Sequence, residues 1–161
     1  MERAFTVAEA RALMPDAAIG ADVMVGFPGE TGADFEESRR FIEDLPFTYL
    51  HVFTYSERPG TPAAADPHSV PIPVRKERNR VLRELAVAKN RAFRERMVGK
   101  TLSAVTLHEP GAALTDNYLK VELVRHREAN AIADLRIGGL TALGLREDGA
   151  VFLRMAVEDN E

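Results

Sequence analysis

The sequence predicts a mixed fold, in which a parallel βαβ unit and a long helix are followed by a small all-β barrel of the OB type. Three observations support this prediction. Residues 22–55 read as strand, helix and strand; a long amphipathic helix covers 74–98; and apolar residues then alternate with polar ones. Because the period changes from 3.6 to 2 at Gly99, we expect two domains, 1–98 and 99–161.

The α/β part begins with a short helix and a buried strand. Thr6 and Glu9 have the spacing of a capping box, which predicts a helix that ends near Met14, before a proline. The run Asp22-Val23-Met24-Val25 is short, β-branched and flanked by glycine. This pattern is typical of a strand that is buried on both faces.

A second helix and strand complete the βαβ unit. Asp34 and Glu37 offer a capping box for an amphipathic helix over 33–44, and the run 48–55 is strand-like. Strand, helix and strand in this order imply parallel pairing with a right-handed crossover. The loops after the two strands therefore start at the same edge of the sheet, where α/β barrels carry their chemistry.

The proline-rich stretch 65–73 is predicted to be a linker without regular structure, and the helix 74–98 follows it. Residues 75–96 hold nine cations and three carboxylates, a net charge of +6. A solvated helix face with i,i+4 ion pairs is the favoured interpretation, and an RNA-facing surface is the alternative. The cations are Arg75, Lys76, Arg78, Arg80, Arg83, Lys89, Arg91, Arg94 and Arg96.

The remaining residues alternate in short runs typical of half-buried strands, at 102–106, 119–123, 131–137 and 150–157. Asp148-Gly149 predicts a hairpin turn before the last run. Residues 98–161 carry a net charge of −3, which is acidic for an RNA-binding domain. RNA binding here would need a focused basic patch, or help from the basic helix.

Composition excludes several classes of protein. No run of roughly 18 apolar residues could span a bilayer, and residues 1–5 do not begin a secretory signal, so we expect a cytoplasmic protein. The chain has no cysteine, which excludes disulfides, Cys-based zinc sites and thiolate-bound iron–sulfur clusters within it. Four scattered histidines predict no metal site.

Three segments together resemble the C-terminal half of the radical-SAM methylthiotransferases: "DVMVGFPGET" at 22–31, "HVFTYSERPGTPAA" at 51–64 and "LTDNYLKV" at 114–121. The sequence Phe-Thr-Tyr-Ser and the Asn-Tyr pair are most similar to those of the branch that methylthiolates threonylcarbamoyladenosine in tRNA. The resemblance implies the last part of an incomplete parallel (βα) barrel, followed by a TRAM domain, which is an RNA-binding β-barrel. It covers residues 6–157.

The resemblance implies an S-adenosylmethionine (SAM) site in the first two segments. Residues beside the adenosyl group would be Val25, Gly26, Phe27 and Glu30. In the second segment, Phe53 and Tyr55 could pack against adenine, Ser56 could hydrogen-bond, and Arg58 could pair with a carboxylate. The alternatives are that Phe53 and Tyr55 belong to the core, that Arg58 bridges to an acidic neighbour, and that Glu30 only favours a helix N-terminus.

An RNA site is expected in the tail. Tyr118 could stack on a base, Asn117 could hydrogen-bond to it, and Lys120 could hold a phosphate, with Arg91 of the basic helix contributing. The expected partners are tRNA and a missing N-terminal portion of the same enzyme.

The absence of cysteine departs from the family, whose radical chemistry needs [4Fe–4S] clusters held by cysteines. We therefore expect clusters only in a longer parent enzyme and no activity from this chain alone. A stand-alone RNA-binding module and a fragment of the related ribosomal-protein methylthiotransferase are the alternatives. Two parallel strands with open edges also predict a homodimer of the fragment.

Overall fold

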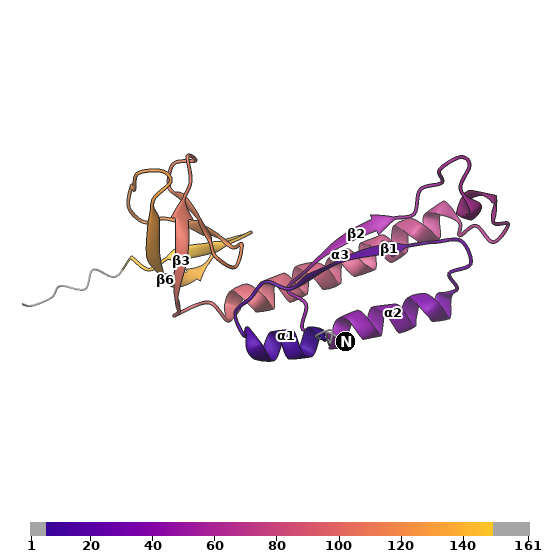
Figure 1. Cartoon of the computed structure of the whole chain (residues 1–161), viewed down its shortest axis with the longest axis horizontal. Coiled ribbons are helices and arrows are strands. Elements are labelled where there is room, and N and C mark those ends of the chain that lie inside the picture. Colours follow the sequence, from indigo (N-terminus) through magenta and orange to yellow (C-terminus); the bar gives the residue numbers. More distant parts are fainter. Residues whose placement is uncertain (1–5, 150–161) are drawn as a thin grey trace, which may run out of the picture. The chain divides into compact units, whose positions relative to one another are not determined.

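The computed structural model describes residues 6–149, which divide into two compact units between Arg96 and Met97 (Figure 1). The first unit is α/β and the second is a β-barrel, as the sequence predicts. No helix among the described residues is long and apolar enough to cross a membrane. The elements of the first unit are α1 (Val7–Leu13), β1 (Gly20–Val25), α2 (Gly32–Asp44), β2 (Tyr49–Thr54), the 3-10 turn η1 (Pro62–Ala65) and α3 (Ile72–Glu95).

Strands β1 and β2 pair in parallel, with Gly20 opposite Tyr49 and Val25 opposite Thr54. This confirms the predicted βαβ unit. Its core lies on one face of the sheet, which α2 and α3 cover. The buried core residues are Val25, Phe35, Ile42, Val52 and Leu82.

The opposite face of the two strands carries large side chains that are about half exposed. Met24 lies opposite Phe53 on this face and Asp22 lies opposite His51, whose Nδ1 is 3.6 Å from a carboxylate oxygen of Asp22. Within the described chain Phe53 is half exposed, because the alternation of β2 buries Val52 instead. The sheet is thus packed on one side and open on the other.

Capping boxes start the first two helices. The box of Thr6 and Glu9 is confirmed. The box predicted for Asp34 and Glu37 is wrong: Thr31 is the N-cap of α2, and Asp34 is its third residue. The Thr31 amide donates to Asp34 Oδ2 over 2.8 Å, and the Asp34 amide donates to Thr31 Oγ1 over 3.2 Å. The motif is the predicted one, placed three residues earlier.

Helix α3 starts at Ile72, inside the stretch predicted to be irregular. Pro71 is its N-cap and Pro73 lies in its first turn, where proline costs no helical hydrogen bond. Two asparagines of α3 also cover the outer edge of β2. The Asn79 amide donates to the carbonyl of Val52 over 3.3 Å, and the Asn90 amide donates to that of Thr48 over 3.4 Å. The expectation of open sheet edges is therefore wrong for these two carbonyls.

The second unit is a closed five-stranded barrel in the order β3-β4-β5-β7-β6. All neighbours are antiparallel except β5 and β7. A bulge between Ile137 and Gly139 bends β6, and a side chain at Gly138 would come within 2.8 Å of Asp148 Cα. The strands are β3 (Thr101–Thr106), β4 (Ala112–Thr115), β5 (Lys120–Glu122), β6 (Ile132–Leu140) and β7 (Leu145–Glu147).

Strands β4 and β7 were not predicted from the sequence, because neither shows a clear alternation of apolar and polar residues. In β4 the neighbours Ala112 and Ala113 are both buried, so no alternation marks the strand. β7 has only three residues, too few to show a period. The strand predicted at 150–157 lies outside the described residues.

Candidate functional site

The parallel register brings two loops together at the carboxyl ends of β1 and β2. Val25 pairs with Thr54, and the Tyr55 amide donates to the Val25 carbonyl over 2.9 Å. The loop that begins at Gly26 therefore starts beside the loop that begins at Tyr55. The sequence predicted this proximity.

The first loop is fixed by a carboxylate that folds back on it. Glu30 accepts a hydrogen bond from the Gly26 amide and lies 2.8 Å from the Arg78 guanidinium, which also donates to the Glu30 carbonyl over 3.0 Å. The Glu30 side chain is only 16% exposed. Its carboxylate is thus engaged inside the protein, whereas the resemblance implied a place beside the adenosyl group.

The second loop combines a buried aromatic with exposed polar groups. The ring of Tyr55 is buried and meets half-exposed Phe27 edge-on, with 5.1 Å between ring centroids. The Tyr55 hydroxyl is buried without a hydrogen-bond partner among residues 6–149. Ser56 and Arg58 are exposed, and the structure gives Arg58 no ion pair in the described part of the chain. The two loops thus place an aromatic pair beside polar groups.

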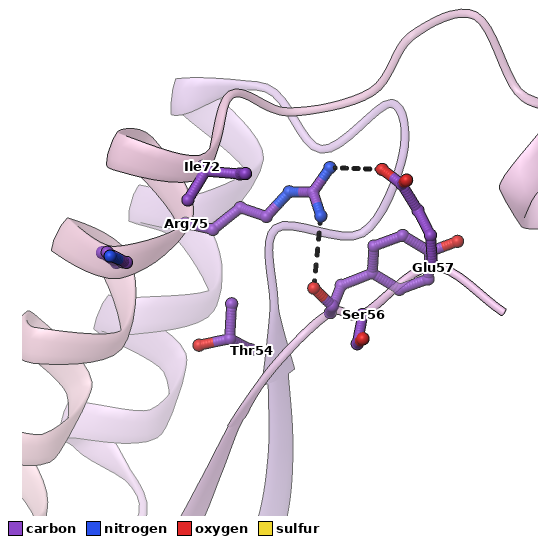
Figure 2. Close-up of a pocket in the computed structure, with 7 residues that line it drawn as sticks. Thr54, Ser56, Glu57, Ile72 and Arg75 are labelled. Carbon is purple, nitrogen blue, oxygen red and sulfur yellow. Dashed lines mark hydrogen bonds and ion pairs between the residues drawn. The ribbon is translucent and has the colours of Figure 1, made fainter.

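Arg75, which the sequence analysis counted only as a surface cation, is buried at this place. It donates to the carbonyls of Val70 (2.6 Å) and Tyr55 (3.2 Å), and to the Ser69 hydroxyl (2.6 Å). Its guanidinium also lies 3.1 Å from Glu57. Figure 2 shows Arg75 reaching from α3 to Glu57.

A cavity of about 490 Å³ opens beside Arg75 (Figure 2). It lies between the end of β2 and the first turns of α3, and it includes two of the predicted site residues, Tyr55 and Ser56. The other lining residues are Thr54, Glu57, Ile72, Arg75 and Lys76.

The basic helix does not present a continuous cationic face. Arg75, Arg78 and Arg94 are buried. Lys89 donates to the carbonyls of Glu43 and Leu45 at the end of α2, and burial there lowers the pKa of its ammonium group. Two of the exposed cations form ion pairs along the helix: Arg80 with Glu84 and Arg91 with Glu95 at the predicted i,i+4 spacing, and Arg80 also with Glu77 at i,i+3.

In the barrel unit, Asn117 and Tyr118 lie in the turn between β4 and β5, and Lys120 is the first residue of β5. Asn117 is buried: its side-chain oxygen accepts from the Thr115 hydroxyl over 2.6 Å, and its amide lies 3.4 Å from Met97 Sδ. It therefore does not present its amide to RNA as predicted. Tyr118 is 78% exposed and has φ +62°, a left-handed conformation that is uncommon for tyrosine.

Cations of the barrel are paired with carboxylates. Lys120 Nζ lies 2.6 Å from a carboxylate oxygen of Glu109, and both side chains are exposed. Its ammonium charge is thus compensated by a neighbouring carboxylate. The other pairs are Arg127 with Glu147, Arg136 with Asp148 and Arg146 with Glu122.

The donor groups differ in how well they fit the two implied cofactors. The half-exposed Phe27, the unpartnered Tyr55 hydroxyl and the exposed Ser56 suit a ligand with a flat ring and polar substituents, as SAM has. An iron–sulfur cluster does not fit this chain. The sequence has no cysteine, and among the described residues no group of three or more acidic or histidine side chains could hold a metal.

No protein-family model matches the chain. Curated relatives do match it, and they are enzymes that modify tRNA. The chain is 37% identical over 123 residues to the threonylcarbamoyladenosine tRNA methylthiotransferase MtaB of Aquifex aeolicus, a match covering 76% of this chain and 30% of the relative. The chain is 34% identical over 160 residues to MtaB of Treponema pallidum, and this match covers 95% of this chain and 32% of the relative.

A second kind of tRNA enzyme matches as well. The tRNA-2-methylthio-N(6)-dimethylallyladenosine synthase of Coxiella burnetii is 43% identical over 106 residues, which cover 62% of this chain and 24% of the relative. The chain is therefore a homologue of the tRNA methylthiotransferases, which confirms the resemblance seen in its motifs. It spans about a third of the length of the MtaB relatives.

Proposed function

We propose that this chain is part of a tRNA methylthiotransferase, in which it supplies one wall of a SAM site and an RNA-binding barrel. One observation carries the proposal. The loops after β1 and β2 lie side by side and bring Phe27 against Tyr55, whose hydroxyl has no partner among the described residues. The homology to tRNA methylthiotransferases supports it.

Each residue of this wall has a binding role in the proposal. When bound, SAM supplies the radical and the methyl group of the reaction. Phe27 offers a flat apolar face for the adenine, and the Tyr55 hydroxyl and Ser56 donate hydrogen bonds to polar groups of the ligand. Arg58 pairs with the carboxylate of the ligand, since its guanidinium is exposed at the same end of the sheet.

The remainder of a parallel barrel would cover the open side of the sheet. The face with Met24 and Phe53 is half exposed, and no other strand of the described chain pairs with the outer edge of β1. An N-terminal portion of the same enzyme would supply the missing strands together with the cysteines for its clusters.

The barrel unit would bind tRNA through Tyr118 and Lys120. An exposed aromatic ring can stack on an unpaired base, and a nearby ammonium can hold a phosphate. Both kinds of relative act on tRNA by name, which favours tRNA over a ribosomal protein as the substrate. A stand-alone RNA-binding module is the second candidate, because the barrel closes within this chain.

Nuclear magnetic resonance titration of the 161-residue chain tests the proposal, since it detects weak binding. Adding SAM at millimolar concentration should shift the amide signals of 26–30 and 55–58. Adding a tRNA anticodon stem-loop should shift those of 116–120. If RNA shifts the amide signals but SAM does not, the chain is a stand-alone RNA-binding module and the proposed SAM site is rejected.

A further inference from the structure

Two arginines of α3 reach the two loops of the candidate ligand site. Arg75 and Arg78 are three residues apart, so they project from the same side of the helix. Both are buried, which is uncommon for arginine unless its donors are satisfied. Each guanidinium serves a different loop, which is the observation to be explained.

Arg75 ties the second loop to the segment that precedes α3. It donates to Tyr55 in one segment and to Ser69 and Val70 in the other, and its guanidinium carbon lies 5.3 Å from the centre of the Tyr55 ring. Its stem lies against Gly26 so closely that a Cβ at Gly26 would overlap the Arg75 side chain. One side chain thus contacts both loops.

Arg78 ties the first loop to the same helix. A single terminal nitrogen donates to both the carbonyl and the carboxylate of Glu30, and the guanidinium carbon lies 5.4 Å from the centre of the Phe35 ring. The same carboxylate accepts the Gly26 amide. Position 26 is therefore held from one side by Arg75 and from the other by Glu30.

We infer that Arg75 and Arg78 are positioning residues, which fix the two loops relative to each other so that Phe27 and Tyr55 face a ligand together. Glu30 acts through Arg78 and the Gly26 amide and does not contact the ligand. The ligand part of this inference rests on the proposed SAM site; the ordering of the loops does not. The planar guanidinium, with five donors, can hold several acceptors at once, which a lysine ammonium on a flexible stem cannot match.

Arg75→Met and Arg78→Met variants of the whole chain test the inference, with Arg80→Met as the control because Arg80 forms only exposed ion pairs on α3. Hydrogen exchange of the Tyr55 amide should become faster in both variants and stay unchanged in the control. SAM affinity, read from the amide shifts, should fall roughly tenfold, as expected for the loss of a charge-assisted hydrogen bond. Arg78→Lys should recover only part of it.

Arg78→Met leaves the mostly buried Glu30 without its charged partner, which could unfold the unit for an unrelated reason. The double variant Arg78→Met/Glu30→Gln removes both charges and should keep its thermal midpoint, yet still exchange the Tyr55 amide fast and bind SAM weakly. Wild-type exchange or affinity in this folded double variant would overturn the inference. Absence of SAM shifts in the wild type would reject the proposed SAM site, and the exchange rates would then decide the loop ordering alone.

Discussion

Single buried polar side chains add to the backbone hydrogen bonds where two segments meet. Thr48 is 1% exposed, and its hydroxyl both accepts from the Ile19 amide (3.0 Å) and donates to the Ile19 carbonyl (3.1 Å). These bonds extend the pairing of β1 and β2 by one residue at its start. The Thr48 side chain thus adds two hydrogen bonds to the one that its backbone amide makes with the Ile19 carbonyl (2.7 Å).

Thr48→Val should lower the free energy of unfolding by about 1–3 kcal/mol, because it keeps the shape and leaves the Ile19 amide without its partner, while the Ile19 carbonyl still accepts from the Thr48 backbone amide (2.7 Å). Urea denaturation measures the change. Thr54→Val, at an exposed position in β2, is the matched control and should stay within about 0.5 kcal/mol of the wild type. Equal effects of the two substitutions would contradict a special role for the Thr48 hydroxyl.

Tyr118 combines an unfavourable backbone conformation with an exposed ring. At φ +62°, Tyr118→Gly should stabilise the barrel by about 1 kcal/mol, measured by thermal unfolding, since glycine carries no penalty there. The same change should weaken binding of a single-stranded RNA by about 1–3 kcal/mol through the lost stacking, measured by fluorescence anisotropy. Stabilisation without any loss of RNA affinity would show that the ring does not contact RNA.

Among the secondary structure elements, those with a local signal could be predicted from sequence. Helix α3 shows a long apolar stripe, and the parallel pair follows from the order strand, helix, strand. The cap of α2 was misplaced because Asp34 and Thr31 both fit the first position of the motif, and only the structure shows that Asp34 is the third residue. The site was harder: Arg78 finds its partner Glu30 48 residues away, so no local pattern marks it as buried.

The cap of α2 makes an element whose stability depends on pH. The hydrogen bond from the Thr31 backbone amide lowers the pKa of Asp34 below its usual value, with help from the Thr31 hydroxyl. A lowered pKa in the folded state means that the stabilisation is present above the unfolded pKa and lost as the pH falls through the folded one. Asp34→Asn should therefore be less stable than the wild type at neutral pH, by urea denaturation.

The difference between Asp34→Asn and the wild type should narrow in acid, because protonated Asp34 is uncharged like asparagine. A substitution on the exposed side of the same helix, Glu37→Gln, serves as the control, since no cap hydrogen bond involves it. A constant difference between Asp34→Asn and the wild type down to low pH would mean that the charge of Asp34 does not stabilise the helix.

At the scale of the whole molecule, the absence of cysteine predicts an inactive chain. No side chain of the 161 residues can provide the thiolates that hold iron–sulfur clusters, so reconstitution with iron and sulfide should yield no charge-transfer absorbance. Methylthiolated nucleosides should likewise be absent from tRNA incubated with the chain and SAM. A relative that carries the cysteines is the positive control, and product formed by this chain alone would overturn the prediction.

The open edge of β1 predicts self-association of the chain. A two-stranded sheet is marginally stable, and an unpaired edge is a template for another strand. Sedimentation at several concentrations should show a dimer, and Asp22→Pro should shift it toward monomer. The N–H of Asp22 faces away from β2, since alternate residue Val23 and residue Val25 face that strand, so proline there blocks only the outer edge.

The asparagine caps on β2 limit how far such association can go. Asn79 and Asn90 occupy two of its outward carbonyls, so a second strand would have to displace both side-chain amides before it could add there. The outer edge of β1 has no strand partner in the described part of the chain, so it is the easier edge to extend. Two copies that join through β1 cover each other's open edge, and each sheet then ends at β2, where two carbonyls are already bonded. We therefore expect association to favour two chains, so that turbidity should not develop at concentrations where a chain with two open edges would form fibres.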